Sequence, residues 1–361
     1  MLKNDTTYVI GVMSGTSLDG VDLCYARFYQ DESKKWHYHI LATACYTYPE
    51  NWVDQLAKAH QMTEAQLKQL DITYTELIGY YYINKFISEF QLKRIHFIAT
   101  HGHTVFHQPE NNYTLQIGNL PFLADIVGYP VVCDFRVQDV EKGGQGAPLV
   151  PMGDILLFAE YDTCVNIGGF VNISRQYENR FLAYDICPAN KVLNHLSQQL
   201  SYPFDEKGQL AASGKVDQHC LTQFDQLDFY RQKPPKSLGL EWVEKEIFPI
   251  LENSELSVED QLATFTQHIS HQLGKHLENS KSVLMTGGGV YNKHLIDLLK
   301  EQVGEKLIIP DDQLINYKEA LVFAFLGLLR YQGENNILAS VTGAPEDHCG
   351  GFIYEPQETS A

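Results

Sequence analysis

A run of glycine, hydroxyl and carboxylate residues, 11–22, interrupts an apolar segment near the N-terminus. Residues 8–10 and 21–25 on either side have the composition of strands, so we expect a hairpin with a glycine-rich connection. Successive backbone N–H groups in such a turn can curl around an anion, which suits the turn to a nucleotide polyphosphate. An ordinary hairpin turn uses the same residue types, so the run alone leaves both interpretations open.

The residues of this run that we expect to bind the nucleotide supply N–H groups, hydroxyls or carboxylates. They are Ser14, Gly15, Thr16, Ser17, Asp19, Gly20 and Asp22. Asp19 is the candidate ligand of a magnesium ion, with water as the expected bridge, because hard oxygen ligands suit that cation.

Size and charge limit the kind of protein that can carry this turn. With 361 residues, of which 44% are hydrophobic, the chain exceeds the size at which one core usually divides, so two domains are expected. The 27 basic and 45 acidic residues give a formal charge of -18, which repels nucleic acid and anionic membranes. We therefore expect neither as a partner.

Cysteine usage and apolar segments indicate a cytoplasmic protein. The 7 cysteines are scattered and form no Cys-x-x-Cys pair, which predicts neither a disulfide framework nor a zinc site. The N-terminus lacks the apolar core of a signal peptide, and the apolar stretch 320–329 is too short to cross a bilayer.

The first half continues with a predicted third strand over residues 36–44 and a helix over 63–90. A buried strand over 95–100 should then present His101 and His103 beyond its C-terminal end, where open α/β sheets bind their ligands.

Two further glycine turns follow predicted strands in the second half. Strands 162–167 and 170–174 flank Gly168 and Gly169, a candidate second phosphate turn. Ser257 is expected to cap a helix, with Asp260 completing a variant capping box.

The third turn follows the predicted strand 282–286. Gly287, Gly288 and Gly289 leave room for a flat group such as adenine and its ribose, and Asn292 should open the next helix. A flexible surface turn is the alternative interpretation of the three glycines.

These three turns resemble the phosphate-1, phosphate-2 and adenosine elements of the ATPase fold shared by actin, hexokinase and heat-shock chaperones. More specifically, the chain resembles the anhydro-N-acetylmuramic acid kinase family nearly end to end. The resemblance covers residues 11–22, 100–105, 114–119, 132–136, 143–151, 166–169, 205–214 and 319–324.

The resemblance implies a two-domain α/β protein of the actin-like ATPase (ribonuclease H-like) fold, with mixed sheets flanked by helices and an active-site cleft between the domains. We expect the N-terminal domain to span residues 1–140, with 345–361 packing back on it, and the C-terminal domain to span 141–344.

Members of this family open the 1,6-anhydro bridge of the sugar with water and transfer the γ-phosphoryl group of ATP to the released C6 oxygen. Their base is the aspartate of an Asp-x-Gly-Pro-Gly-Asn motif, which residues 185–190 match here. Asp185 is therefore the candidate base, expected at a strand end; the alternative is a helix cap for the segment near Pro188. Cys187 and Ala189 replace the two glycines of the motif, and Asn194 replaces a further aspartate, which leaves another sugar open as the substrate.

The resemblance also implies a substrate side formed by His101, Gln116, Arg136 and Asn190. Arg136 can clamp the lactyl carboxylate of a muramic acid in bidentate fashion, the alternative being an ion pair with Asp134 or Asp139. His101, His103 and His107 also suggest a metal site, but hydrogen bonding to sugar or water is favoured over zinc.

The implied cofactors are ATP and Mg²⁺, and a homodimer is expected. Two other functions stay open: a kinase for a different sugar or sugar acid, and a non-catalytic, ATP-driven conformational switch on the same fold.

Overall fold

The computed structural model describes residues 6–15, 18–177 and 180–357 of the chain. It divides into two compact units, Met1–Leu157 with Tyr317–Ala361, and Phe158–Asn316. The units change at residues 157 and 317, whereas the expected domain boundaries at residues 140 and 344 stay predictions. Within the first unit, a Cβ on Gly153 would lie 2.6 Å from the Val322 side chain, and one on Gly327 would lie 2.5 Å from that of Ala99, so these segments are fitted closely together.

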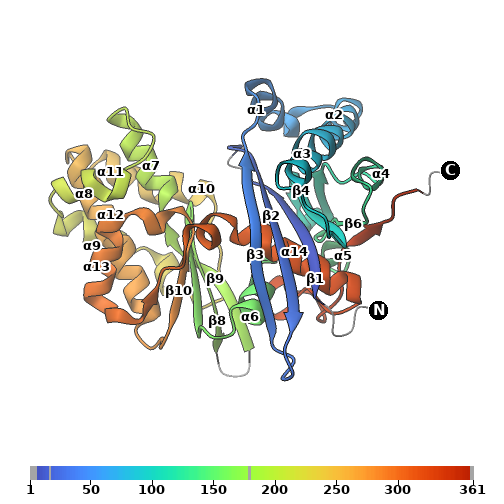
Figure 1. Cartoon of the computed structure of the whole chain (residues 1–361). Coiled ribbons are helices and arrows are strands. Elements are labelled where there is room, and N and C mark those ends of the chain that lie inside the picture. Colours follow the sequence, from blue (N-terminus) through green and yellow to red (C-terminus); the bar gives the residue numbers. More distant parts are fainter. Residues whose placement is uncertain (1–5, 16–17, 178–179, 358–361) are drawn as a thin grey trace. The chain divides into compact units, whose positions relative to one another are not determined.

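The elements of the first unit are drawn in Figure 1. They are β1 (Thr7–Ser14), β2 (Val21–Gln30), β3 (Trp36–Tyr46), α1 (Glu50–Ala57), η1 (Ala59–Gln61), α2 (Glu64–Glu76), η2 (Leu77–Ile83), α3 (Asn84–Glu89), β4 (Phe97–Gln108), η3 (Pro109–Asn111), β5 (Tyr113–Ile117), α4 (Leu123–Val127), β6 (Val131–Cys133), α5 (Val137–Glu141), α6 (Pro151–Leu157), α14 (Asp312–Gln332, which begins in the second unit), α15 (Ala339–Thr342) and β12 (Phe352–Tyr354).

The elements of the second unit are β7 (Thr163–Ile167), β8 (Phe170–Tyr177), β9 (Arg180–Pro188), α7 (Asn190–Gln199), η4 (Glu206–Gly208), α8 (Gln209–Ser213), α9 (Gln218–Asp225), η5 (Asp228–Arg231), α10 (Leu240–Trp242), η6 (Val243–Ile247), α11 (Phe248–Glu252), α12 (Val258–Leu277), β10 (Val283–Thr286), η7 (Gly288–Tyr291), α13 (Lys293–Val303), η8 (Gly304–Lys306) and β11 (Leu307–Ile308).

The strands of the second sheet follow the same order and directions as the central strands of the first sheet. In the first unit β1, β2 and β3 form an antiparallel meander, β4 lies parallel to β1, and β6 lies parallel to β4. In the second unit β7, β8 and β9 form the meander, β10 lies parallel to β7, and β11 lies parallel to β10. The first sheet adds β5 beside β4 and β12 beside β6. This repeated order of mixed strands is that of the expected ribonuclease H-like, actin-like fold, and the fold-class prediction is confirmed.

Helices cover both faces of the first sheet. On one face, Ile10 and Val12 of β1 join a buried cluster with Tyr74 of α2 and Phe86 of α3. On the other, α14 approaches β1 so closely that a Cβ on Gly11 would overlap the main-chain oxygen of Ala320. Strand alternation explains why Gly11, between two core residues, is the one that meets α14.

The core of the second unit lies between its sheet and α7, α12 and α13. Leu262, Phe265, Ile269 and Leu273 form the buried stripe of α12. Ser257 caps this helix as predicted, but the Asp260 side chain does not complete a capping box. It accepts from the Lys215 N–H at 2.6 Å instead.

Two hairpins, one long helix and one helix cap are confirmed. The predicted hairpins at residues 8–25 and 162–174 are β1–β2 and β7–β8, and the predicted helix 63–90 is the continuous α2–η2–α3 segment. Asn292 caps α13 by accepting from the Leu295 N–H at 3.0 Å.

Candidate functional site

The first glycine run, residues 11–22, covers the end of β1, the connection to β2 and the first residues of β2. Gly20 is buried against β3, where a Cβ would lie 2.5 Å from the Tyr46 oxygen, whereas Asp19 is exposed. Burial raises the pKa of Asp22 to about 6, the Cys45 thiol opposes this change, and the charges of Asp19 and Glu319 add to it. The Leu18 N–H bonds the Gly15 carbonyl at 3.4 Å. Thr16 and Ser17 lie outside the described residues.

Ser14 is held by a buried cluster of hydroxyl and imidazole groups. Its Oγ lies 2.7 Å from Tyr48 Oη and 3.0 Å from His103 Nδ1, and it accepts from Tyr74 Oη at 2.9 Å. Burial lowers the pKa of His103 to about 4, so the imidazole is neutral at pH 7. The Ser14 hydroxyl is therefore engaged in the core, and the residue itself pairs with Val21 of β2 and His103 of β4.

His101 and Arg136 form a second cluster. The Arg136 Nε–H donates to His101 Nε2 at 2.9 Å, so the ring proton of the neutral histidine lies on Nδ1, which is 2.9 Å from the Gly102 oxygen. Another Arg136 nitrogen donates to the Gly146 carbonyl at 2.6 Å. Burial lowers the pKa of Arg136 to about 10, against the effect of the Glu319 carboxylate.

The alternative ion pairs of Arg136 are not formed. Asp134 accepts from the Asn119 amide at 2.9 Å. Asp139 accepts from the Gly146 N–H at 2.6 Å and from the Thr342 hydroxyl at 2.8 Å.

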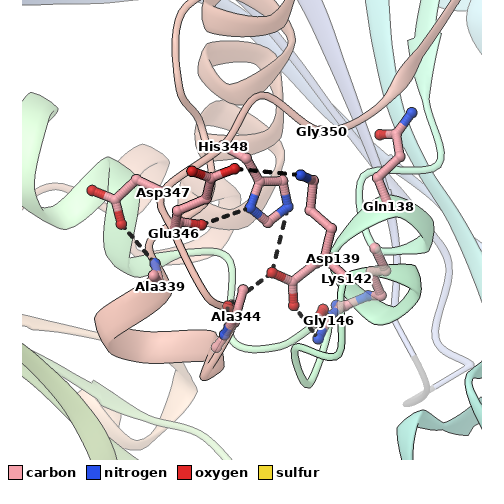
Figure 2. Close-up of polar contacts among 12 residues, drawn as sticks. Gln138, Asp139, Lys142, Gly146, Ala339, Ala344, Glu346, Asp347, His348 and Gly350 are labelled. Carbon is pink, nitrogen blue, oxygen red and sulfur yellow. Dashed lines mark hydrogen bonds and ion pairs between the residues drawn. The ribbon is translucent and has the colours of Figure 1, made fainter.

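Asp139 thereby joins the C-terminal segment to the Arg136 cluster. Figure 2 shows its carboxylate between His348 and Gly146, with His348 Nε2 at 3.5 Å from Oδ1. Asp139 is fully buried and fills the space in which a Cβ on Gly144 would lie. The Gly146 carbonyl accepts from Arg136, while the Gly146 N–H donates to Asp139. The Asp139 carboxylate therefore fixes the backbone to which Arg136 is bound.

The histidines near β4 have separate partners. His101 and His103 lie inside β4, which continues to Gln108, so the prediction that they project beyond a strand end is wrong. Gly102 adopts φ +73° between them, and the pairing of β1 with β4 shifts register here, so the strand bends without ending. His107 bonds Thr114 Oγ1 at 3.1 Å.

No group of three or more His, Cys, Asp or Glu side chains suited to a metal ion occurs among residues 6–15, 18–177 and 180–357.

Gln116 is buried in β5 of the first sheet. Its amide nitrogen donates to Thr114 Oγ1 at 2.9 Å and to Thr104 Oγ1 at 3.4 Å.

The glycine turns of the second unit lie together at the carboxyl ends of β7 and β10, which are parallel neighbours in its sheet. A Cβ on Gly287 would lie 2.6 Å from Asn166 Oδ1, and one on Gly289 would overlap Ile167 Cγ2. Gly288 is exposed beside them. The segment after β9 joins the same place, because the Asn190 N–H donates to the Gly168 carbonyl at 3.1 Å and the Ala189 N–H to that of Gly169 at 2.8 Å. Gly168, Gly169, Asn190 and Gly287–Gly289 are therefore brought together.

Asp185 belongs to a row of polar residues across three strands. Asn166 of β7 pairs with Asn172 of β8, which pairs with Asp185 of β9. Asp185 Oδ1 accepts from the Asn172 amide, and Oδ2 accepts from the Leu238 N–H at 2.7 Å. Burial raises the pKa of Asp185, and both hydrogen bonds oppose this change.

Asp185 lies within β9, so the expected strand end is wrong. A register shift between Val171 and Asn172 lets the strand continue to Pro188. The helix-cap alternative is also wrong, because Ala189 is the N-cap residue of α7 and the carboxylate of Asp185 is engaged elsewhere.

Cys187 and Ala189 are fully buried in the core of the second unit. Their side chains add apolar contacts there, and burial raises the pKa of the Cys187 thiol. These replacements therefore do not crowd the exposed side of the glycine turns.

Asn172 and Leu238 were not expected at the site. The sequence Val-Asn-Ile occurs on both sides of Gly168-Gly169, and a polar residue alternating with apolar ones in paired strands is a signal for Asn166 and Asn172. Leu238 acts through its backbone, which has no residue-type signal.

Two mixed sheets of one strand order, each with a glycine turn after the first strand of its meander, define an α/β protein of the ribonuclease H-like, actin-like ATPase fold. The family model for anhydro-N-acetylmuramic acid kinase matches residues 7–356, and the chain belongs to this family.

Curated relatives agree with the family match. The anhydro-N-acetylmuramic acid kinase of Sulfurimonas denitrificans is 31% identical, over 96% of this chain and 99% of the relative. That of Actinobacillus pleuropneumoniae is 34% identical, over 96% and 98%.

Among solved structures, component A of the (R)-2-hydroxyglutaryl-CoA dehydratase of Acidaminococcus fermentans matches with a TM-score of 0.46 and 15% identity, over 88% of this chain and 96% of that one.

Across the described ranges, none of the helices combines the length and apolar character needed to cross a membrane.

Proposed function

We propose that this chain is an ATP-dependent kinase that opens 1,6-anhydro-N-acetylmuramic acid with water and phosphorylates it to N-acetylmuramic acid 6-phosphate. Family membership over residues 7–356 supports the kinase class and the substrate. The observation that carries the mechanism is Asp185, a carboxylate held by two donors on a rigid strand.

In this mechanism Asp185 takes a proton from the attacking water. Burial raises its pKa, which increases its strength as a base, while hydrogen bonds from the Leu238 and Asn172 donors favour its ionised form. The water oxygen bonds the anomeric carbon, and the bond to the bridging oxygen breaks. That oxygen, released at C6, receives the γ-phosphoryl group of ATP as the bond to the β-phosphate breaks and ADP leaves.

We assign the nucleotide to the glycine turns. Residues 14–22 and Gly168-Gly169 would hold the phosphates, and Gly287–Gly289 the adenosine. Asp19, exposed on its turn, supplies the type of hard oxygen ligand that suits Mg²⁺, and the ion would neutralise phosphate charge.

The substrate side would be formed by His101, Gln116, Arg136 and Asn190. Arg136 is a buried cation fixed by His101 and Gly146, which suits it to hold a sugar-acid carboxylate in one orientation. A cytoplasmic location and a homodimer stay predictions.

The test is to incubate the protein with Mg-ATP and 1,6-anhydro-N-acetylmuramic acid and to weigh the product. We expect the sugar to gain one water and one phosphoryl group. Asp185→Asn should lower turnover by about 100- to 10,000-fold with ATP affinity retained. A product that gains the phosphoryl group alone, or normal turnover by the variant, would contradict the proposal.

A further inference from the structure

The loop between η5 and α10, residues 232–239, holds Asp185 at two points. The Asp185 N–H donates to the Lys236 carbonyl at 3.0 Å, and its Oδ2 accepts from the Leu238 N–H at 2.7 Å. The first contact fixes the backbone of β9 against the loop. The second fixes the carboxylate itself, so the position of the loop decides whether this donor reaches Asp185.

Lys236 anchors this loop from inside. Its side chain is buried, its ammonium donates to the Phe229 carbonyl at 3.0 Å, and the nitrogen lies 4.3 Å from the centre of the Phe229 ring. In the described parts of the chain, no carboxylate lies within ion-pairing distance of it. A buried ammonium without a carboxylate is costly, so the carbonyl and ring contacts are what compensate for its desolvation.

The other end of the anchor is fixed to α12. Tyr230, next to Phe229, lies with its Oη 2.9 Å from His268 Nε2, and His268 Nδ1 lies 2.7 Å from Asp225 Oδ1. His268 is fully buried, so the ring that links Tyr230 to Asp225 is shielded from water. The Lys236 ammonium therefore ties the loop to a part of the unit that cannot shift easily.

We propose that Lys236 is a positioning residue for the catalytic base: by binding the Phe229 carbonyl it closes the loop so that the Leu238 N–H reaches the Asp185 carboxylate. The proposal rests on the role given to Asp185 in the proposed function. It adds a residue outside the active-site motifs, 51 positions along the chain from Asp185, whose effect passes through the backbone.

This arrangement has a measurable consequence. The Leu238 N–H stabilises the ionised carboxylate, so its loss raises the pKa of Asp185. Cys187 on β9 and His276 on α12 are the other titratable groups that sense Asp185 or Lys236. Both residues are unchanged in the Lys236 variant described below.

The variant is Lys236→Met, which keeps the length and apolar stem but removes the ammonium. Lys233→Met, an exposed position of the same loop, is the matched control. The readout is the titration midpoint of the Asp185 carboxyl, followed by ¹³C NMR of aspartate-labelled protein and assigned with Asp185→Asn. This readout needs no turnover, so it separates failure of this inference from failure of the proposed function.

We expect Lys236→Met to raise the midpoint by about one pH unit, the equivalent of one lost charge-assisted hydrogen bond. The acid limb of the kcat profile should move by the same amount with an unchanged KM for ATP, and Lys233→Met should match the wild type. An unmoved midpoint in folded Lys236→Met overturns the proposal, even if kcat falls. Should that variant fail to fold, Lys236→Gln, whose shorter and uncharged side chain replaces the ammonium that binds the Phe229 carbonyl, should move the midpoint in the same direction, and no movement overturns the proposal.

Discussion

Exchanging the two partners of the Asn172–Asp185 pair tests whether the base must stand at position 185. The double variant Asn172→Asp/Asp185→Asn keeps one carboxylate and one amide. The amide introduced on β9 can still accept from the Leu238 N–H and donate to the new carboxylate on β8, because the two positions are direct cross-strand partners. The net charge is unchanged.

The expected magnitude follows from the distance that the charge moves. Paired residues on neighbouring strands are about 5 Å apart, whereas a misplacement of about 1 Å can lower a rate about 100-fold. Turnover of the exchanged variant should therefore fall as far as in Asp185→Asn, by about 100- to 10,000-fold. Its stability should stay within about 1 kcal/mol of the wild type because both hydrogen bonds are retained.

The assay is product formation from the anhydro sugar at saturating Mg-ATP, with urea unfolding and ATP titration calorimetry on the same preparation. Turnover within about tenfold of the wild type would refute the assignment of the base to Asp185, since a carboxylate one strand away would then serve equally well. Loss of folding in the exchanged variant would refute the hydrogen-bond argument.

Two further predictions concern stability. Gly289→Ala should destabilise the protein by about 1–3 kcal/mol in urea because its Cβ would overlap Ile167, whereas Gly288→Ala, with open space around it, should change stability by less than about 0.5 kcal/mol; equal effects would contradict the packing argument. His103, whose folded pKa of about 4 lies below its ordinary value of 6.5, should make stability fall as the pH drops from 6.5 to 4, because the unfolded chain then binds a proton that the folded chain does not. The loss is up to about 3 kcal/mol, and His103→Asn should weaken this pH dependence of urea unfolding; an unchanged slope would contradict it.

Local patterns were sufficient to predict most elements of the fold. The hairpins around the first two glycine turns, the capped helix at Ser257 and the Asn292 cap follow from signals within a few residues of each position. The two errors at functional positions have one cause. Gly102 and the bulge beside Asn172 bend strands that continue, and a bend resembles an end when the pairing partner is unknown.

Contacts over long sequence separations could not be predicted. The site role of Leu238 depends on its N–H, which every residue except proline has, and that of Asp139 depends on a segment that begins at Thr342. Composition and spacing carry no information about either contact, because both arise from how distant segments pack.

The close approach of α14 to Gly11 shows that the glycines of the run 11–22 meet two different requirements. Gly11 meets a helix backbone, while Gly15 belongs to the turn toward which a phosphate is assigned. A descendant of this chain that had abandoned nucleotide chemistry but kept its architecture would be expected to retain the first glycine and lose the second. Part of the glycine-rich run could thus be retained in a related protein that has lost the activity.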